Sequence, residues 1–415
     1  MKHTLTALAE KYAQVRKQTE QLVKPLETED FVVQPIVDVS PPKWHLGHTT
    51  WFFENFILAT FSKGYKLFDV DFNFLFNSYY ESQGDRILRD KRGALSRPTT
   101  KRVFEYRKHI DSAMMRFLEN LEHQVDEIEK FLTIGINHEQ QHQELLVTDI
   151  KYILGANPIK PAYLSRAAHQ SENTSHEFKW LKVDAGTYTI GYSGEDFHFD
   201  NEKGVHKVYI EAFKCANRLV TNGEYLEFMK AGAYEKAALW LAEGWDWVQA
   251  NHSNSPFYWF EENEKWWIYT LHGVKEVKLD ETLTHINFYE AEAFARWKGK
   301  RLLTEQEWEV AAQIYGRNEQ AHFQNQHYFQ PQTAIDNQFF GTAWEWTNSA
   351  YLPYPFYKQE AGALGEYNGK FMVNQMVLRG GSCATPQDHF RLSYRNFFHP
   401  HLQWQFTGIR LAKHL

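Results

Sequence analysis

Two histidines one helical turn apart are the residues whose type and spacing most directly suggest chemistry. They are His138 and His142, in the string HEQQH. Residues at i and i+4 project from one face of a helix, so both imidazoles can reach one metal ion. A neighbouring helix can supply a third ligand. His48 is the best candidate, and His45, three residues earlier, is a rival.

The same string also matches the zinc-protease motif HExxH, in which Glu139 would be the general base. A zinc protease needs a further ligand downstream. The residues after His142 read QELLVTDIKYILGANP and contain no histidine, and the later window AYLSRA contains no glutamate. A protease is therefore disfavoured. An all-imidazole site could hold Fe(II), Zn(II), Ni(II) or Cu(II), and residue types do not choose among these ions.

The elements that must position these histidines lie in a helical N-terminal part, residues 1–157. Hydrophobic periodicity and breaker residues predict four long helices. They are expected near residues 5–23, after Ser40-Pro41-Pro42, from about Thr99, and from about Val125 to Leu154. Four long helices joined by loops are typical of an up-and-down bundle. Ser40 is expected to cap the second helix. The stretch from Lys63 to Arg97 is too long for a plain turn and should be functional or carry short elements.

The remainder of the chain shows a different pattern of predicted secondary structure. Residues 158–177 form a polar linker, and residues 178–415 read as an irregular α+β domain. Short strands are expected at 188–191 and 208–210, and short helices at 286–298 and 304–313. In the last of these, Thr304 and Glu307 would form a capping box, and Trp308 would be buried.

Composition restricts the class of protein. The chain has 415 residues, too many for one ordinary core, and a net charge of −7, which gives no reason to expect nucleic acid as a partner. Its two cysteines suit a reducing cytoplasm. No run of about 18 apolar residues is present, and the first residues lack a signal-peptide core, so neither a membrane span nor export is expected. The oligomeric state is unknown at this stage.

Eight strings, taken in order, resemble those of the ergothioneine-biosynthesis sulfoxide synthases, also called hercynine oxygenases. The N-terminal strings look like a DinB-type four-helix domain, and the C-terminal strings are similar to the formylglycine-generating-enzyme sulfatase fold, a C-type-lectin-like α+β domain. The strings are PPKWHLGHTTWFFENFIL, FLFNSYYE, RGALSRPT, NHEQQHQELL, KRLLTEQEWEVAA, GTAWEWTNS, VLRGGSCATP and RLSYRNFFHPHLQWQFTGIRLA.

This resemblance implies an Fe(II) centre held by His48, His138 and His142. It further implies O2-dependent formation of a C–S bond between a thiol and the imidazole C2 of hercynine (Nα-trimethylhistidine), giving a sulfoxide. The contacts to hercynine that the resemblance implies fall on Gln141 and Asn396. A trimethylammonium group has no N–H to donate and is held by aromatic faces. Phe397, Trp51 and Trp404 are candidates for that role.

The resemblance also bears on the thiol. Relatives that take γ-glutamylcysteine carry an acidic residue in a string resembling Arg-Asn-Trp-Asp. The corresponding residues here, 395–398, read RNFF, so Phe398 stands where that carboxylate would be. The sequence therefore favours free L-cysteine as the sulfur donor.

Tyr79 and Tyr80, a pair shared with the cysteine-using relatives, are the catalytic candidates, because a phenol near the reacting oxygen can donate a proton. A guanidinium would suit the cysteine carboxylate. Arg89 is the first choice, from the group Arg86, Arg89, Arg92 and Arg97.

Two alternatives stay open beside this interpretation. One is a related reaction on the same scaffold with γ-glutamylcysteine, a selenium donor or another acceptor, and the other is a metal-binding DinB-type module without turnover. Formylglycine generation, a rival that the second domain suggests, is disfavoured because it needs two nearby cysteines to hold copper. Cys383 stands alone in GGSC and is expected to be a small buried hydrophobe.

Overall fold

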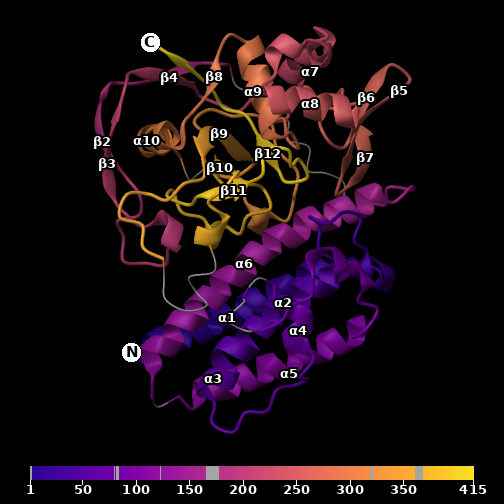
Figure 1. Ribbon diagram of the computed structural model, residues 1–415, viewed down its shortest axis with the longest axis vertical. Helices are drawn as coiled ribbons and strands as arrows, with labels where there is room; N and C mark the ends of the chain where they lie inside the picture. Colours follow the sequence, from indigo (N-terminus) through magenta and orange to yellow (C-terminus); the bar gives the residue numbers. More distant parts are fainter. Residues whose placement is uncertain are drawn as a thin grey trace. The chain divides into compact units, whose positions relative to one another are not determined.

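The computed structural model describes residues 2–78, 80, 84–121, 123–164, 177–317, 321–359 and 368–415, with side chains from residue 5 onward. These residues form two compact units (Figure 1). The first comprises the described residues up to 164, and the second comprises those from 177 onward.

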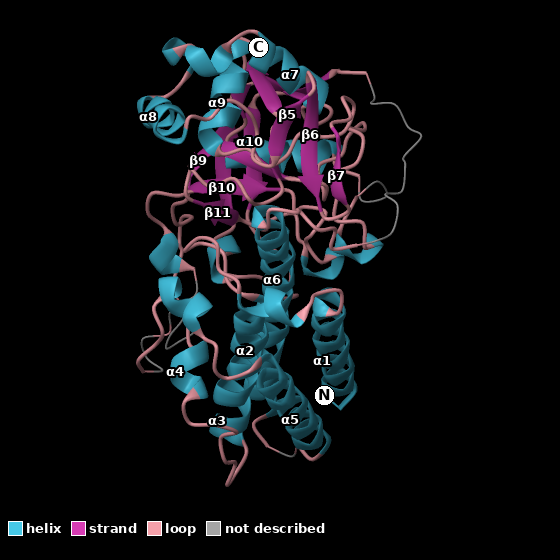
Figure 2. Cartoon of the chain, turned by 90° about the vertical axis from the view of Figure 1, so that its right-hand side faces the viewer, coloured by secondary structure: helices cyan, strands magenta, loops and turns pink. Residues whose placement is uncertain are grey.

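The first unit is a helical bundle (Figure 2). Its long helices are α1 (Lys2–Val23), α2 (Pro42–Phe53), α5 (Thr100–Glu119) and α6 (Val125–Ala156). Both α1 and α2 pack against α5 and α6, which makes a four-helix arrangement with one shared core. The amphipathic α5 shows why: Val103, Ile110 and Met114 recur at helical spacing, and all are fully buried. The four long helices predicted from the sequence are confirmed.

Helix α2 is buried along its whole length and continues into a π-helical turn, η2 (Glu54–Leu58), and the short α3 (Ala59–Phe61). Pro42 occupies its first turn as predicted, but the predicted Ser40 cap is wrong, since Pro41 stands at the cap position. The Ser40 groups are used in tertiary contacts instead. Its N–H donates to Asp149, and its hydroxyl accepts from Arg92.

The long connection between α3 and α5 carries short elements of its own, as predicted. They are α4 (Phe72–Phe76) and the 3-10 helix η4 (Arg89–Ala94); another 3-10 helix, η1 (Thr28–Val32), precedes α2. The Glu54 carboxylate anchors this connection. It accepts hydrogen bonds from the Tyr65 hydroxyl at 2.9 Å and from the Phe68 N–H at 2.8 Å.

The second unit is built from small sheets with helices and long loops between them. This is the irregular α+β organisation that the sequence predicts. One sheet has the order β1 (Trp180–Val183), β4 (Phe213–Ala216), β13 (Leu411–His414), β8 (Arg301–Leu302). A second has the order β11 (Asn396–Phe398), β10 (Met376–Arg379), β9 (Trp344–Ala350), β12 (Thr407–Gly408). A two-stranded hairpin is formed by β2 (Gly186–Ile190) and β3 (His206–Ile210). A three-stranded antiparallel sheet is formed by β5 (Trp259–Glu262), β6 (Lys265–Thr270) and β7 (Gly273–Glu276).

Helices of the second unit include α7 (Asn222–Lys230), α8 (Ala242–Asn251), α9 (Phe288–Trp297) and α10 (Glu305–Tyr315). The capping box predicted at the start of α10 is present, with the Thr304 hydroxyl accepting from the Glu307 N–H at 3.2 Å. Trp308 is fully buried as expected and donates its indole N–H to Glu345. Among the described residues, no helix combines the length and apolar character needed to cross a membrane.

Candidate metal centre

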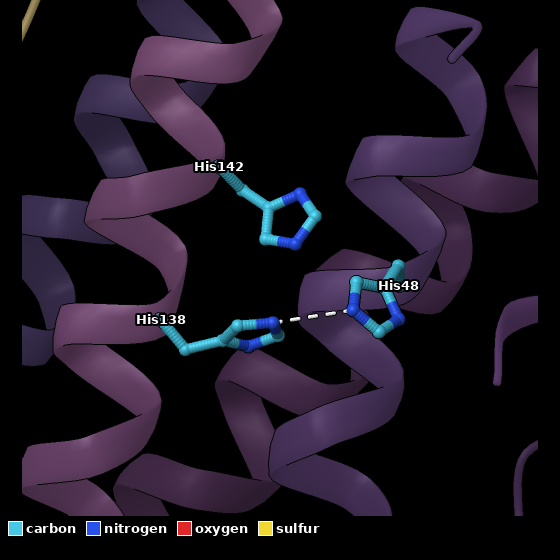
Figure 3. A group of neighbouring side chains, drawn as sticks. All are labelled: His48, His138 and His142. Atoms are coloured by element: carbon cyan, nitrogen blue, oxygen red, sulfur yellow. Dashed lines mark hydrogen bonds between the residues drawn. The ribbon is translucent and has the colours of Figure 1, made fainter. Parts of the chain in front are cut away.

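Three histidines of the first unit converge. His48 comes from α2, and His138 and His142 come from α6 (Figure 3). Each offers one ring nitrogen, and these atoms all lie within 4.8 Å of one another. The Nε2 atoms of His48 and His138 are 3.2 Å apart. Two imidazole nitrogens bound to one ion at about 2.1 Å lie roughly 3 Å apart at a right angle, so this spacing suits a shared metal.

Local structure explains how His48 reaches this point. Its ring is held between two indoles, stacked on Trp44 with centroids 4.6 Å apart and on Trp51 with centroids 5.7 Å apart. Its Nδ1 lies 2.7 Å from the carbonyl oxygen of Phe76 at the end of α4. A carbonyl can only accept, so Nδ1 carries the proton and Nε2 presents its lone pair.

The electrostatics suit a metal site as well. Burial, with the neighbouring His138, lowers the pKa of both His48 and His142 well below the ordinary value. Burial lowers the pKa of His138 to about 3, against the opposing field of Glu139. Metal ions bind the unprotonated imidazole, so three neutral rings are ready as ligands at neutral pH. The donor set fits a divalent transition-metal ion.

Glu139, the base of the protease alternative, is committed elsewhere. One carboxylate oxygen accepts from Arg107 at 2.5 Å and from the Thr19 hydroxyl at 2.6 Å; the other accepts from Arg16 at 2.9 Å. Burial alone would raise the pKa of this carboxyl, but the Arg107 and Arg16 guanidiniums lower it to about 2. Glu139 therefore ties α1, α5 and α6 together, which gives a physical reason against a protease.

His45, the rival ligand, has a different position. Its Nδ1 lies 2.8 Å from Nδ1 of His142, and its Nε2 lies 3.0 Å from Oδ2 of Asp149. Both of its nitrogens are thus engaged, and the group of convergent nitrogens is completed by His48.

Of the two tyrosine candidates, Tyr79 lies outside the described residues. Tyr80 is fully buried, and its ring lies 5.6 Å from that of Trp51 and 5.3 Å from that of Phe56. Its backbone N–H donates to the Asn77 side chain, which in turn donates to the Tyr80 carbonyl. Tyr80 is therefore held one ring away from His48, through the shared neighbour Trp51.

The arginine candidates divide by burial. Arg89 is half exposed and donates to the backbone carbonyl of Asp38 at 2.8 Å. Arg92 is buried, and its guanidinium lies over the Trp44 ring, 3.4 Å from the ring centroid. Its charge also helps to lower the pKa of His48. The sequence favoured Arg89 over Arg92. Local geometry does not separate the two, because a 3-10 helix places residues three apart on one side, and tertiary packing buries only Arg92.

The remaining candidates lie in both units. Gln141 is half-buried on α6 of the first unit. In the second unit, Asn396, Phe397 and Phe398 form β11, which pairs antiparallel with β10. Phe397 stacks on Tyr351 with centroids 4.0 Å apart.

Of the other aromatic candidates, Trp51 and Trp404 are buried, and Phe398 is half-buried. Phe398 lies 6.1 Å from Trp404, centroid to centroid, and Trp404 is only 4% exposed. Trp51 is fully buried and donates its indole N–H to Asn73 at 2.8 Å. Cys383 is buried, as predicted.

Comparison with known families agrees with this two-part architecture. Residues 11–146 match the family model of the DinB superfamily. Residues 165–340 and 336–415 match the model described as sulfatase-modifying factor enzyme 1-like domain, which covers more than half of the chain. The first unit thus carries a DinB-type domain and the second a sulfatase-modifying-factor-like domain.

Curated relatives match two thirds of the chain. The chain is 29% identical over 310 residues to the hercynine oxygenase of Mycolicibacterium smegmatis, covering 67% of this chain and 70% of that protein. It is 28% identical over 305 residues to the hercynine oxygenase of Mycobacterium tuberculosis, again covering 67% of this chain and 70% of that protein. The chain joins a DinB-type helical domain to a sulfatase-modifying-factor-like domain, and it belongs to the hercynine oxygenase family of enzymes.

Proposed function

We propose that this enzyme is a non-haem iron(II), O2-dependent sulfoxide synthase of ergothioneine biosynthesis. Its substrates would be L-cysteine, hercynine and dioxygen, and it would join sulfur to the imidazole C2 of hercynine. The thiol loses its S–H bond and hercynine its C2–H bond, while one C–S and one S–O bond form. The four electrons and two protons released convert dioxygen into the sulfoxide oxygen and one water.

The observation that carries this proposal is the convergence of three neutral imidazole nitrogens within 4.8 Å, in a chain of this family. His48, His138 and His142 would hold the ferrous ion. When bound, the ion would supply the one-electron chemistry that activates dioxygen. Three protein ligands leave other coordination positions open, which a catalytic site requires.

The chain's own residues would orient the substrates and move a proton. Tyr80 is the described candidate for the proton donor, because it lies against Trp51, which stacks on His48. Tyr79 is proposed as its alternative, on the sequence alone. For the cysteine carboxylate, Arg89 remains the candidate from the sequence. The burial of Arg92 over Trp44 makes it a second candidate.

The substrate-binding roles of Gln141, Asn396 and Phe397 remain predictions from the family resemblance. Free L-cysteine is proposed as the donor because Phe398 lacks the carboxylate of the γ-glutamylcysteine users. γ-Glutamylcysteine and selenium analogues are the competing donors. A cytoplasmic location also remains a prediction, from the scarcity of cysteine.

Oxygen uptake and product analysis would test the proposal. The metal-free protein is reloaded with ferrous ion under argon and mixed with hercynine or histidine. Each acceptor is combined with cysteine, γ-glutamylcysteine, selenocysteine or no thiol. We expect a sulfoxide of hercynine and cysteine, formed faster than any other product. Tight iron binding without product from any pair would favour the metal-binding module instead, and a preference for γ-glutamylcysteine would reverse the donor assignment.

Two histidine variants make the metal assignment specific. His142→Ala should abolish turnover and weaken iron binding. His109→Ala, an exposed histidine on α5, should leave both unchanged. Equal losses of turnover and iron binding in the two variants would count against the three-histidine metal site.

A further inference from the structure

We propose that His45 and Asp149 form a buried hydrogen-bond relay that sets the tautomer of His142, so that His142 presents Nε2 to the metal. His45 is then a positioning residue, and Asp149 positions His45. This inference rests on the proposed metal site, and it concerns residues outside the ligand triad.

The relay is continuous in the structure. Nδ1 of His142 lies 2.8 Å from Nδ1 of His45, and Nε2 of His45 lies 3.0 Å from Oδ2 of Asp149. The two imidazole rings meet edge to face, with centroids 5.1 Å apart and planes inclined at 64°. These distances are those of hydrogen bonds between well-placed groups.

The direction of the relay follows from what each atom can do. The ionised Asp149 carboxylate accepts only, and its Oδ2 already accepts the Ser40 N–H at 2.9 Å. Nε2 of His45 faces this acceptor and must therefore carry a proton. Two imidazole nitrogens at hydrogen-bond distance share one proton, so either His45 or His142 donates between the two Nδ1 atoms. A metal ion can be bound only by an unprotonated Nε2 of His142, and the proton of this ring then lies on Nδ1, which donates to His45.

Burial isolates the relay from solvent. His45 and Asp149 are each only 3% exposed, so water competes little for these bonds. The relay also joins two elements, because His45 lies on α2 three residues before His48, and Asp149 lies on α6 seven residues after His142. It thus links the ligand from α2 to a ligand from α6.

The Nδ1 atoms of His142 and His48 are both held by a hydrogen bond, but their acceptors differ. His48 donates its Nδ1 proton to a backbone carbonyl, that of Phe76, whereas His142 donates to a second imidazole backed by a carboxylate. Partners of this kind fix the ring orientation of metal-ligating histidines. Side chains, unlike a backbone carbonyl, can be removed by substitution, so the relay is directly testable.

The first test uses the metal-free protein and its imidazole tautomers. Long-range 1H–15N correlation spectra should show His142 with the proton on Nδ1 in the wild type. His45→Phe, which keeps a ring and removes both nitrogens, should leave His142 as a mixture of tautomers. A wild-type His142 protonated at Nε2, or an unchanged spectrum in His45→Phe, would overturn the relay.

The second test measures metal affinity by competition with a chelator, using Fe(II) and Co(II). His45→Phe and Asp149→Leu should each weaken binding about 10- to 100-fold. The double variant should bind metal no more weakly than the single variant with the lower metal affinity, because the two residues act in series. Additive losses, or unchanged affinity in both single variants, would overturn the relay.

Two further variants separate the relay from general damage to the fold. Asp149→Asn can keep an oxygen acceptor in place and should weaken metal binding less than Asp149→Leu. Thr148→Val alters a buried neighbour whose hydroxyl donates only within α6, to the Leu145 carbonyl, and should leave metal affinity unchanged. If the wild type binds no metal, the proposed function fails, while the tautomer of His142 still decides the relay.

Discussion

The Nδ1 atom of His48 and the carbonyl oxygen of Phe76 lie 2.7 Å apart, although 28 residues separate them in the chain. Phe76 ends α4, in the connection between α3 and α5, so this connection takes part in orienting a proposed metal ligand. Gly47 makes the contact possible, because a side-chain carbon there would overlap the Phe76 ring.

Gly47→Ala should therefore weaken metal binding by about tenfold and destabilise the fold by about 1–3 kcal/mol. The added methyl group pushes Phe76 away and loosens the hydrogen bond to His48. Metal titration and denaturant unfolding measure the two effects. Leu118→Ala truncates a buried residue of α5 and should lower stability while keeping metal affinity. Equal metal affinity in Gly47→Ala and the wild type would contradict this prediction.

Glu139→Gln should cost about 3–5 kcal/mol of folding free energy at pH 7, because Arg16 and Arg107 lose their buried counter-charge. The pKa of Glu139 is lowered to about 2 in the folded protein. The carboxylate thus stabilises the fold above its ordinary pKa, and this contribution is lost as the pH falls toward 2.

Unfolding free energies at pH 5, 4 and 3 test this assignment. The wild type should lose stability with acid more steeply than Glu139→Gln, in which nothing titrates at this position. Glu127→Gln, at an exposed position of α6, should behave like the wild type. The same acid dependence in wild type and Glu139→Gln would refute the ion cluster as a source of stability.

Tyr80→Phe should lower sulfoxide formation by about 100-fold while lowering simple oxidation of the thiol much less, because only the first reaction would use its proton. Mass spectrometry of both products gives the ratio. Tyr79→Phe is the parallel test, and Tyr152→Phe, a half-buried phenol on α6, is the control. Equal losses of both products would remove the proton-donor role.

Phe398→Asp should raise the preference for γ-glutamylcysteine over cysteine by about tenfold or more, since an ionised group that meets an amine gains about 1.5–3 kcal/mol. The ratio of kcat/KM for the two thiols is the measurement. Phe398→Asn, which loses the same contact with Trp404 but adds no charge, is the matched control. An identical ratio in the Asp and Asn variants would argue against a charge-based choice of thiol.

Much of this architecture could be predicted because it depends on neighbours in the chain. The i, i+4 spacing of His138 and His142 and the capping box at Thr304 are local, and helix geometry alone decides their consequences. The Ser40 cap failed for the opposite reason, because Arg92, far away in sequence, donates to its hydroxyl.

The sequence by itself determined which residues share a helical face, the order of the two domains, and a set of histidines able to bind a metal. Only the tertiary structure brought His48 rather than His45 into the group of convergent histidine nitrogens, turned Glu139 toward Arg16 and Arg107, and buried Arg92 rather than Arg89. Helical periodicity states which side chains lie together on one helix. Which neighbouring helix that face meets is set by packing between residues far apart in the chain.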